Sequence, residues 1–207
     1  MNNFARPRAA EDVDPNSRQA RILQAAIEEF ASVGFTGARV DRIADASGCS
    51  KQLIYYYYKH KAGLWDAVLL AMTENAPTDW LVVDDELSGS IRHQVYVTGS
   101  TRVWTNLLAW EGAELAPGST PALAETRRAV WERRIAQVEH SKAVGNIDPR
   151  FDSEMLVLAL SMITAAPQTL RQNTKLITGE EPASQEFADR MTTFLDLLFT
   201  HLRPASD

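Results

Sequence analysis

Residues 40–58 read VDRIADAS, then GC, then SKQLIYYYY, and this short segment carries the clearest structural signal in the chain. The spacing predicts two short helices, at about 40–47 and 51–57, joined by a tight turn. Gly48 ends the first helix, where a left-handed residue is needed, and Ser50 caps the second. In a helix-turn-helix of this kind the second helix enters the major groove of DNA.

The rest of the chain also predicts helices, because its apolar residues recur at spacings of three and four and strand-like alternation is nearly absent. We expect an N-terminal helix that starts near Asp14-Pro15 and ends at Gly34. We expect further helices at about 61–76, 85–98, 100–115, 120–145, 153–178 with a break at Pro167, and 184–203. Ser119-Thr120-Pro121 and Glu181-Pro182-Ala183-Ser184 are the expected entries to two of them. The fold class is therefore all-α.

Composition excludes several classes of protein. The 207 residues are 45% hydrophobic and 23% charged, an ordinary globular composition. No apolar run reaches the roughly 18 residues of a membrane span, and the N-terminus lacks the apolar core of a secretory signal. A single cysteine excludes an intramolecular disulfide framework and a cysteine-based zinc site. We expect a soluble, cytoplasmic protein with no metal, no cofactor and no membrane partner.

The charge is unevenly distributed along the chain. The formal net charge is −6, yet residues 1–63 hold nine Lys or Arg against seven Asp or Glu. Residues 39–61 hold five basic residues against two acidic ones. Because phosphate contacts dominate affinity for nucleic acid, this local excess of basic residues supports binding to double-stranded DNA.

The segment GFTGARVDRIADASGCSKQLIYYYYKHKAGL, residues 34–64, resembles the DNA-binding segment of the TetR family of transcriptional regulators. The resemblance implies a flexible arm at 1–13, a helix-turn-helix domain at 14–60 and a helical ligand-binding and dimerisation domain at 61–207. Its detailed motif covers only about 22–64, whereas residues 80–207 match in helical pattern alone.

The resemblance also implies roles for single residues. Lys51, Gln52 and Leu53 would face base edges, Tyr55 would touch a thymine methyl or the backbone, and Tyr57 and Lys61 would bind phosphate. Tyr56 either reads bases or is merely exposed, while Ile54 and Tyr58 belong to the core. The family usually has threonine where Arg39 stands, and arginine reaches phosphate but cannot cap a helix. The full predicted DNA-binding set is Arg39, Ser50, Lys51, Gln52, Leu53, Tyr55, Tyr56, Tyr57 and Lys61.

Two helices near the C-terminus have more apolar surface than one neighbour can bury. Residues 155–166, MLVLALSMITAA, carry no charge, and the last helix has an apolar stripe. We expect these helices to pair with their copies in a second subunit as a four-helix bundle, an arrangement that the resemblance also implies. The alternative is that they bury each other within one chain. The predicted homodimer interface consists of Met155, Leu158, Met162, Met191, Phe194, Leu195, Leu198 and Leu202.

The resemblance implies a cavity in the helical body, whose occupant shifts the fourth helix and changes the spacing of the two DNA-reading helices. Candidate lining residues are Trp104, Leu108, Trp110, Trp131 and Met162, which favour a small, largely apolar ligand. Arg127, Arg128, Arg133 and Arg134 are expected on the solvent side of the 120–145 helix.

The sequence thus favours a ligand-responsive DNA-binding regulator, most simply a repressor that binds a palindromic operator as a homodimer. A protein-interaction module and a ligand-independent regulator are the alternatives. No HExxH, P-loop or GxSxG motif or catalytic carboxylate pair is present, so we expect no enzymatic activity.

Overall fold

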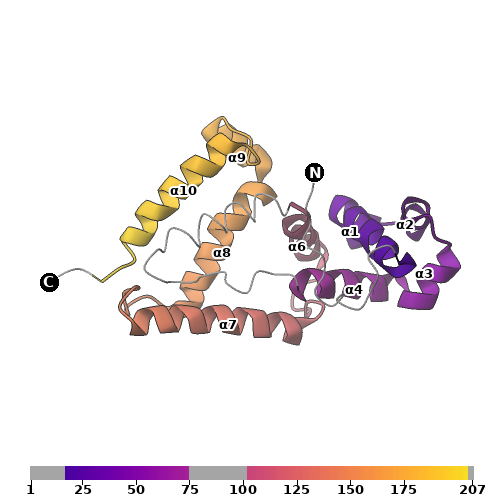
Figure 1. The fold of residues 1–207 in the computed structure, drawn as a ribbon, viewed down its shortest axis with the longest axis horizontal. Coiled ribbons are helices and arrows are strands. Elements are labelled where there is room, and N and C mark those ends of the chain that lie inside the picture. Colours follow the sequence, from indigo (N-terminus) through magenta and orange to yellow (C-terminus); the bar gives the residue numbers. More distant parts are fainter. Residues whose placement is uncertain (1–16, 75–101, 205–207) are drawn as a thin grey trace. The chain divides into compact units, whose positions relative to one another are not determined.

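The computed structural model describes residues 17–74 and 102–204, and within these ranges all regular structure is helical (Figure 1). The helices are α1 (Arg18–Gly37), α2 (Val40–Ser47), α3 (Lys51–Tyr58), α4 (Lys61–Glu74), α6 (Arg102–Glu114), α7 (Ala124–Ala143), α8 (Ser153–Thr169), α9 (Arg171–Thr178) and α10 (Gln185–Thr200). The predicted all-α class is confirmed. The predicted arm at 1–13 and helix at 85–98 lie outside the described residues.

The chain divides into two compact units. One comprises Met1–Ala76 and Asn106–Arg127, and the other comprises Pro77–Thr105 and Arg128–Asp207. The first unit therefore joins the helix-turn-helix and α4 to the second half of α6. The functional boundary predicted after residue 60 stays a prediction.

Helix α1 begins at Arg18, and Asp14-Pro15, where its start was predicted, lies outside the described residues. Its N-cap is Ser17, whose hydroxyl accepts a hydrogen bond from the backbone N–H of Ala20 at 3.1 Å. Gly34 interrupts α1 as predicted, because its φ of 73° lies in the left-handed region that glycine adopts without strain. One further turn, ending at Gly37, follows this interruption and leads to α2.

The short helices α2 and α3 have the capping that the sequence predicts. Gly48 has a φ of 63° and a ψ of 31°, the left-handed conformation of a helix C-cap. The Ser50 side chain accepts a hydrogen bond from the N–H of Leu53 at 3.2 Å and so caps α3. The three-residue linker, 48–50, therefore fixes where α2 ends and where α3 begins.

A single apolar core holds α1–α4 together. Its fully buried side chains include Ile22 and Phe30 from α1, Ile43 from α2, Ile54 from α3 and Leu64 and Val68 from α4. The rings of Phe30 and Trp65 meet edge to face with centroids 5.1 Å apart. Each buried side chain of this size contributes about 1.5–3 kcal/mol. One face of α3 packs on this core, and the opposite face is open to solvent.

The start of α7 differs from the prediction. The expected entry at Ser119-Thr120-Pro121 is followed by turn residues, and the helix begins at Ala124. Leu123 has a φ of 54°, which no residue of a right-handed α-helix can adopt. The carbonyl of Leu123 still accepts the N–H of Arg127 at 2.9 Å, so the helical bonding begins there.

The break predicted at Pro167 occurs three residues later, at Leu170. Helix α8 continues through Pro167 to Thr169, and the chain leaves helical geometry at Leu170, with φ −110° and ψ 52°. Proline removes only one backbone donor, and the next bonds survive: Leu170 N–H donates to the carbonyl of Ala166 at 2.8 Å. Helix α9 then ends at Gly179, and Ser184 caps α10 as expected.

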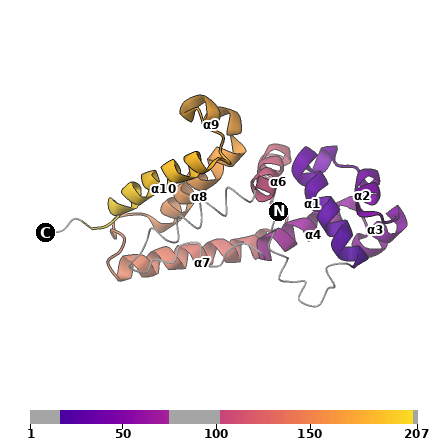
Figure 2. The same cartoon turned by 45° about the horizontal axis from the view of Figure 1, so that its top comes forward.

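Helices α8 and α10 lie side by side in the second unit (Figure 2). Their core contains Leu156, Val157 and Leu160 from α8, Leu195 and Phe199 from α10, and Val138 from α7. Ile147 and Leu202, from the segments that flank these helices, complete the cluster.

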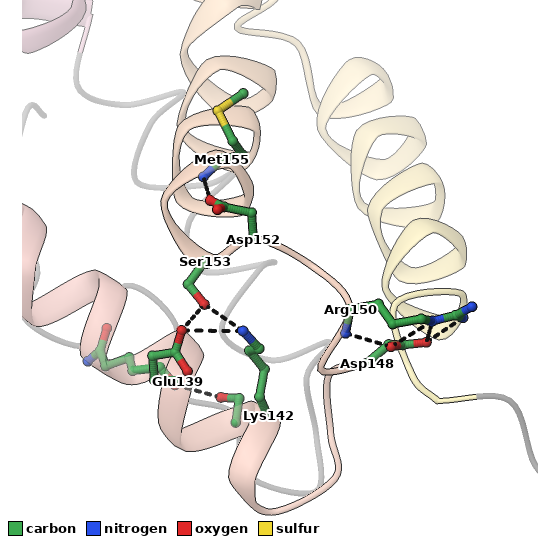
Figure 3. Close-up of polar contacts among 9 residues, drawn as sticks. Glu139, Lys142, Asp148, Arg150, Asp152, Ser153 and Met155 are labelled. Atoms are coloured by element: carbon green, nitrogen blue, oxygen red, sulfur yellow. Dashed lines mark hydrogen bonds and ion pairs between the residues drawn. The ribbon is translucent and has the colours of Figure 1, made fainter.

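The corner between α7 and α8 is held by polar contacts, shown in Figure 3. Ser153 donates its hydroxyl to the Glu139 carboxylate, and Lys142 Nζ donates to Ser153 Oγ at 3.1 Å. In the loop itself, the Asp148 carboxylate accepts Arg150 Nη2 at 2.6 Å. The Asp152 side chain accepts the N–H of Met155 at 2.9 Å and caps α8.

Candidate DNA-binding site

The outer face of α3 is polar and aromatic. Lys51, Gln52, Tyr55, Tyr56 and Tyr57 are exposed, and Leu53 is half-buried. Ile54 and Tyr58 point into the core, as predicted from the helical spacing. The structure thus gathers six of the predicted DNA-binding residues on the solvent side of one helix. Side chains on such a face can reach base edges and phosphates together.

Tyrosines make up much of this face. Tyr56 is the most exposed of them at 70%, and its ring meets that of Tyr57 with centroids 5.4 Å apart. Lys59 Nζ lies 5.8 Å from the Tyr56 ring centroid and donates to the Tyr56 carbonyl at 3.2 Å. Each phenol has a hydroxyl for a phosphate oxygen and a ring for a thymine methyl.

Tyr58 contrasts with its three neighbours. It is 9% exposed, and its hydroxyl donates to the carbonyl of Gln19 on α1 at 3.4 Å. Burial raises the pKa of Tyr58 to about 12, since the phenolate would lose its hydration. Tyr58 therefore anchors α3 to α1 and takes no part in the exposed face.

Lys51 already has an acidic neighbour. Its ammonium forms an ion pair with the carboxylate of Asp41 on α2, and both side chains are at least half exposed. An exposed pair of this kind contributes little stability and is screened by salt. A DNA phosphate or a guanine edge can therefore replace Asp41 as the partner of Lys51 at small cost.

Arg39 stands at the N-cap of α2 but makes no capping bond with its side chain. Its backbone N–H instead donates to Glu29 Oε1 on α1 at 2.9 Å. The same oxygen accepts Arg42 Nε at 2.7 Å, and Arg42 Nη2 reaches the carbonyl of Gly37 at 3.0 Å. A carboxylate from another helix thus supports the start of α2, and the Arg39 guanidinium remains exposed.

The start of α4 lies beside α3. His60 Nδ1 accepts the N–H of Gly63 at 2.9 Å, so this N–H at the start of α4 is not free to bind phosphate. A Cβ on Gly63 would lie 2.3 Å from the Tyr58 carbonyl, which explains why glycine stands there. Lys61 Nζ lies 4.8 Å from the Phe35 ring centroid and donates to the Thr36 carbonyl at 3.3 Å.

The predicted ligand-lining residues are in different surroundings. Trp104 and Leu108 on α6 are half-buried, whereas Trp110 and Trp131 are partly exposed. Met162 is more than half exposed on α8, beside Met155 and Leu158 in the helical repeat. Trp104 and Leu108 thus keep the burial expected of cavity-lining residues, and Met162 fits an outer surface better.

The predicted dimer residues fall into three groups. Met155, Leu158 and Met162 on α8 and Phe194 on α10 are more than half exposed, and Leu197 on α10 is exposed with them. Leu195 and Leu202 are buried in the core of the same chain, so they are not available to a partner. Met191 and Leu198 are partly buried against that core.

The expectation for the α7 arginines was half wrong. Arg128 and Arg133 are exposed, but Arg127 and Arg134 lie on the inner side of the helix. Arg127 forms an ion pair with Glu111 at 2.6 Å. The Arg134 guanidinium lies 4.7 Å from the Trp131 ring centroid, and burial lowers its pKa to about 10. Arg127 and Arg134 are two helical turns apart, so they share one face of α7, and this spacing in the sequence could have predicted it.

Two negative findings concern the described residues only. Within 17–74 and 102–204 no helix combines the length and apolar character that crossing a membrane requires. The same part of the chain contains no group of three or more His, Cys, Asp or Glu arranged to hold a metal ion.

Comparison with known proteins places this geometry in context. The family model described as bacterial regulatory proteins, tetR family, matches residues 22–68. The HTH-type transcriptional repressor SCO4008 of Streptomyces coelicolor is 32% identical over 181 residues, covering 85% of this chain and 92% of that protein. RutR of Escherichia coli K12, an HTH-type transcriptional regulator, is 39% identical over 54 residues, 26% of each chain.

Solved structures have the same fold. The transcriptional regulator SCO4942 from Streptomyces coelicolor superposes with a TM-score of 0.72 at 25% identity, covering 91% of this chain and all of that one. The ketosteroid transcriptional regulator KstR2 of Mycobacterium tuberculosis superposes with a TM-score of 0.66 at 16% identity, covering 92% and 97%. At that identity the second likeness concerns the fold alone.

Proposed function

The chain belongs to the TetR family and is a DNA-binding transcriptional regulator, and we propose that it represses transcription as a homodimer on a palindromic operator. A small, largely apolar ligand releases it from the DNA. Its function is regulation without a catalytic step, carried out in the cytoplasm, where bacterial DNA lies. The observation that carries the proposal is the exposed face of α3, with Lys51, Gln52 and three tyrosines over an apolar core.

The proposed contacts follow from the positions and the exposure of the side chains. Gln52 is exposed on the first turn of α3 and hydrogen bonds to a base edge through its amide. Lys51 leaves its ion pair with Asp41 and binds DNA in its place. Phosphates are bound by Tyr57 on α3 and by Arg39, Ser50 and Lys61 on the neighbouring segments, and these contacts set the register of α3 in the groove. Tyr55 and Tyr56 contact thymine methyl groups or the sugar–phosphate backbone.

The proposed dimer uses the exposed apolar surface of α8 and α10. Met155, Leu158 and Met162 recur at spacings of three and four on α8, and Phe194 and Leu197 lie three apart on α10. An apolar surface on two adjacent helices is favourable only when a partner covers it. A copy of the same two helices supplies a matching surface, and the result is a four-helix bundle with two-fold symmetry.

Repression and ligand release are the finer parts of the proposal. The similar protein SCO4008 is named a repressor, which supports the sign of regulation chosen here. Trp104 and Leu108 of α6 are half-buried, and aromatic and aliphatic surfaces of this kind suit an apolar ligand. The ligand must bind the form released from DNA more tightly than the DNA-bound form.

Selection of bound duplexes from a random pool tests the proposed function. We expect the selected sequences to converge on an inverted repeat, with half-sites about one helical turn or a multiple of it apart, roughly 34–36 Å. A screen of small apolar compounds for release from the selected duplex then tests the ligand. Selection that yields no enriched sequence at low salt would contradict operator binding.

A further inference from the structure

Both backbone polar groups of Thr36 are bound by charged side chains of other helices. Its N–H donates to both carboxylate oxygens of Glu114, at 3.2 and 3.1 Å. Its carbonyl accepts Lys61 Nζ at 3.3 Å. Thr36 lies in the extra turn that follows the interruption of α1, while Glu114 ends α6 and Lys61 starts α4. All three residues belong to the first compact unit.

Side chains from the end of α6 lie directly against Gly34 of α1. A Cβ on Gly34 would lie 2.5 Å from Glu114 Oε1 and 2.9 Å from the Trp110 ring. Distances this short are below van der Waals contact, so a side chain at position 34 would require the Glu114 carboxylate and the Trp110 ring to move. Gly34 therefore serves two purposes: it adopts the positive φ that turns the chain, and it leaves room for Glu114 and Trp110.

Helix stability does not explain an acidic residue at this position. The C-terminal end of a helix has a partial negative charge, so carboxylates in the last turn are unfavourable there. Helix α6 nevertheless has Glu111 and Glu114 in its last turn, and both are engaged. Glu111 pairs with Arg127 at the start of α7, at 2.6 Å, and Glu114 binds the Thr36 N–H. The last turn of α6 is thus fixed to α7 on one side and to the DNA-binding helices on the other.

We propose that Glu114 is a positioning residue for DNA recognition, which fixes the helix-turn-helix to α6 through the backbone N–H of Thr36. This inference rests on the proposed dimer and palindromic operator. Binding to such an operator requires two reading helices at one fixed separation, whereas non-specific binding requires only basic residues near phosphates. The family resemblance implied a route through α4, and the contact found here adds the α1 turn as a second attachment.

The test compares Glu114→Ala and Glu114→Gln with the wild-type full-length protein. Glu132→Gln is the matched control, because it removes the same charge from an exposed position on α7. The probes are the duplex selected by the wild-type protein and a random-sequence duplex of equal length. Hydrogen–deuterium exchange is followed in the peptides that contain Thr36 and Ile54.

We expect Glu114→Ala to weaken binding to the selected duplex by about tenfold, because a charge-assisted hydrogen bond is lost. Its affinity for the random duplex stays at the wild-type level, and a repeated selection accepts a wider range of half-site spacings. Exchange becomes faster at Thr36 and stays unchanged at Ile54. Glu114→Gln keeps an acceptor oxygen and shows a smaller change in the same direction, and Glu132→Gln matches the wild type.

Two results would overturn the inference while leaving the proposed function intact. One is wild-type affinity and a single half-site spacing in both Glu114 variants. The other is an equal loss of affinity for the two duplexes in Glu114→Gln, the variant of nearly identical shape. If the wild-type protein itself selects no duplex, the proposed function falls and this inference falls with it.

Discussion

Glu29 on α1 accepts the backbone N–H of Arg39 at 2.9 Å, so the first residue before α2 is tied to another helix and not capped by its own side chain. A threonine at position 39 would place a hydroxyl where the free N–H groups of the first turn lie. Arginine gives up that bond and keeps a cation at the edge of the DNA-binding face. Stability and DNA affinity are therefore opposed at this position.

Arg39→Thr is accordingly expected to move two measurements in opposite directions. Capping stabilises the protein by about 1 kcal/mol, read as a higher midpoint in urea unfolding. Loss of a phosphate contact weakens binding to selected and random duplexes alike and flattens the salt dependence by about one unit. Arg39→Ala, which removes the cation without adding a cap, is the control and should weaken binding without the gain in stability. Unchanged DNA affinity in both variants would remove Arg39 from the interface.

Gly34→Ala is compared with Gly118→Ala, because only Gly34 combines close neighbours with a backbone conformation special to glycine. Both glycines have positive φ, 73° and 80°, so both substitutions carry a backbone cost of about 1–3 kcal/mol, and Gly34, with a ψ of 179°, lies in a region that only glycine adopts readily. Only Gly34 has neighbours in the way, whereas a Cβ on Gly118 meets nothing within 4 Å. Urea unfolding should therefore show a clearly larger loss of stability for Gly34→Ala. Equal losses would mean that α6 does not pack on Gly34 in solution.

Leu158→Glu tests the proposed dimer surface. Leu158 is 51% exposed in one chain, and a carboxylate there would be buried without a partner in the four-helix bundle. We expect the variant to be monomeric by light scattering after size-exclusion chromatography and to lose binding to the selected duplex.

The matched control for the dimer is Leu176→Glu on α9. Leu176 is 84% exposed, so the same substitution on this chain changes charge and polarity without touching α8 or α10 of the proposed bundle. It should remain dimeric. Dissociation by both variants, or by neither, would contradict an interface centred on α8.

Acid should weaken the corner between α7 and α8. Arg150 hydrogen bonds lower the pKa of Asp148 below its ordinary 3.8, and the Ser153 hydroxyl, with Lys142, lowers that of Glu139 below 4.5. Because the folded state favours the charged carboxylates, their contribution is complete above about pH 4.5 and is lost as pH falls through the lower folded values.

The Asp148→Asn variant should therefore lose less stability between pH ~5 and pH ~3 than the wild type, measured by urea unfolding across that range. Asp66→Asn, an exposed carboxylate on α4, controls for the change in net charge. If the free energy of unfolding of Asp148→Asn falls with decreasing pH as steeply as that of the wild type, the Arg150 contact does not persist in solution.

Local signals in the sequence predicted the helix-turn-helix well. Gly48 and Ser50 act through bonds to residues three or four positions away, so spacing alone locates them. Features that depend on distant residues were not predictable. Glu29 and Arg39 are ten residues apart, and Glu114 and Thr36 are 78 apart. Nothing in a local pattern distinguishes such carboxylates from exposed ones.

The errors in the helical body have the same origin. Leu195 and Leu202 carry the same apolar signal as Phe194, and only the packing of α8 against α10 decides which of them is covered within the chain. The expected break at Pro167 relied on local chemistry, but the bonds around proline were enough to continue α8 for two more residues. The start of α7 was predicted too early because Leu123 has a positive φ. Glycine and asparagine adopt such a φ more often than leucine does, so the sequence gives no sign of it there.

The most direct test of DNA recognition is the salt dependence of binding to the selected duplex, measured for the wild type and for Lys61→Ala. If α3 and its neighbours contact phosphates as proposed, the logarithm of the association constant falls steeply and linearly with the logarithm of salt concentration. Lys61→Ala should bind every duplex more weakly and reduce the slope by about one. A shallow slope in the wild-type protein, unchanged by Lys61→Ala, would contradict phosphate binding through this surface.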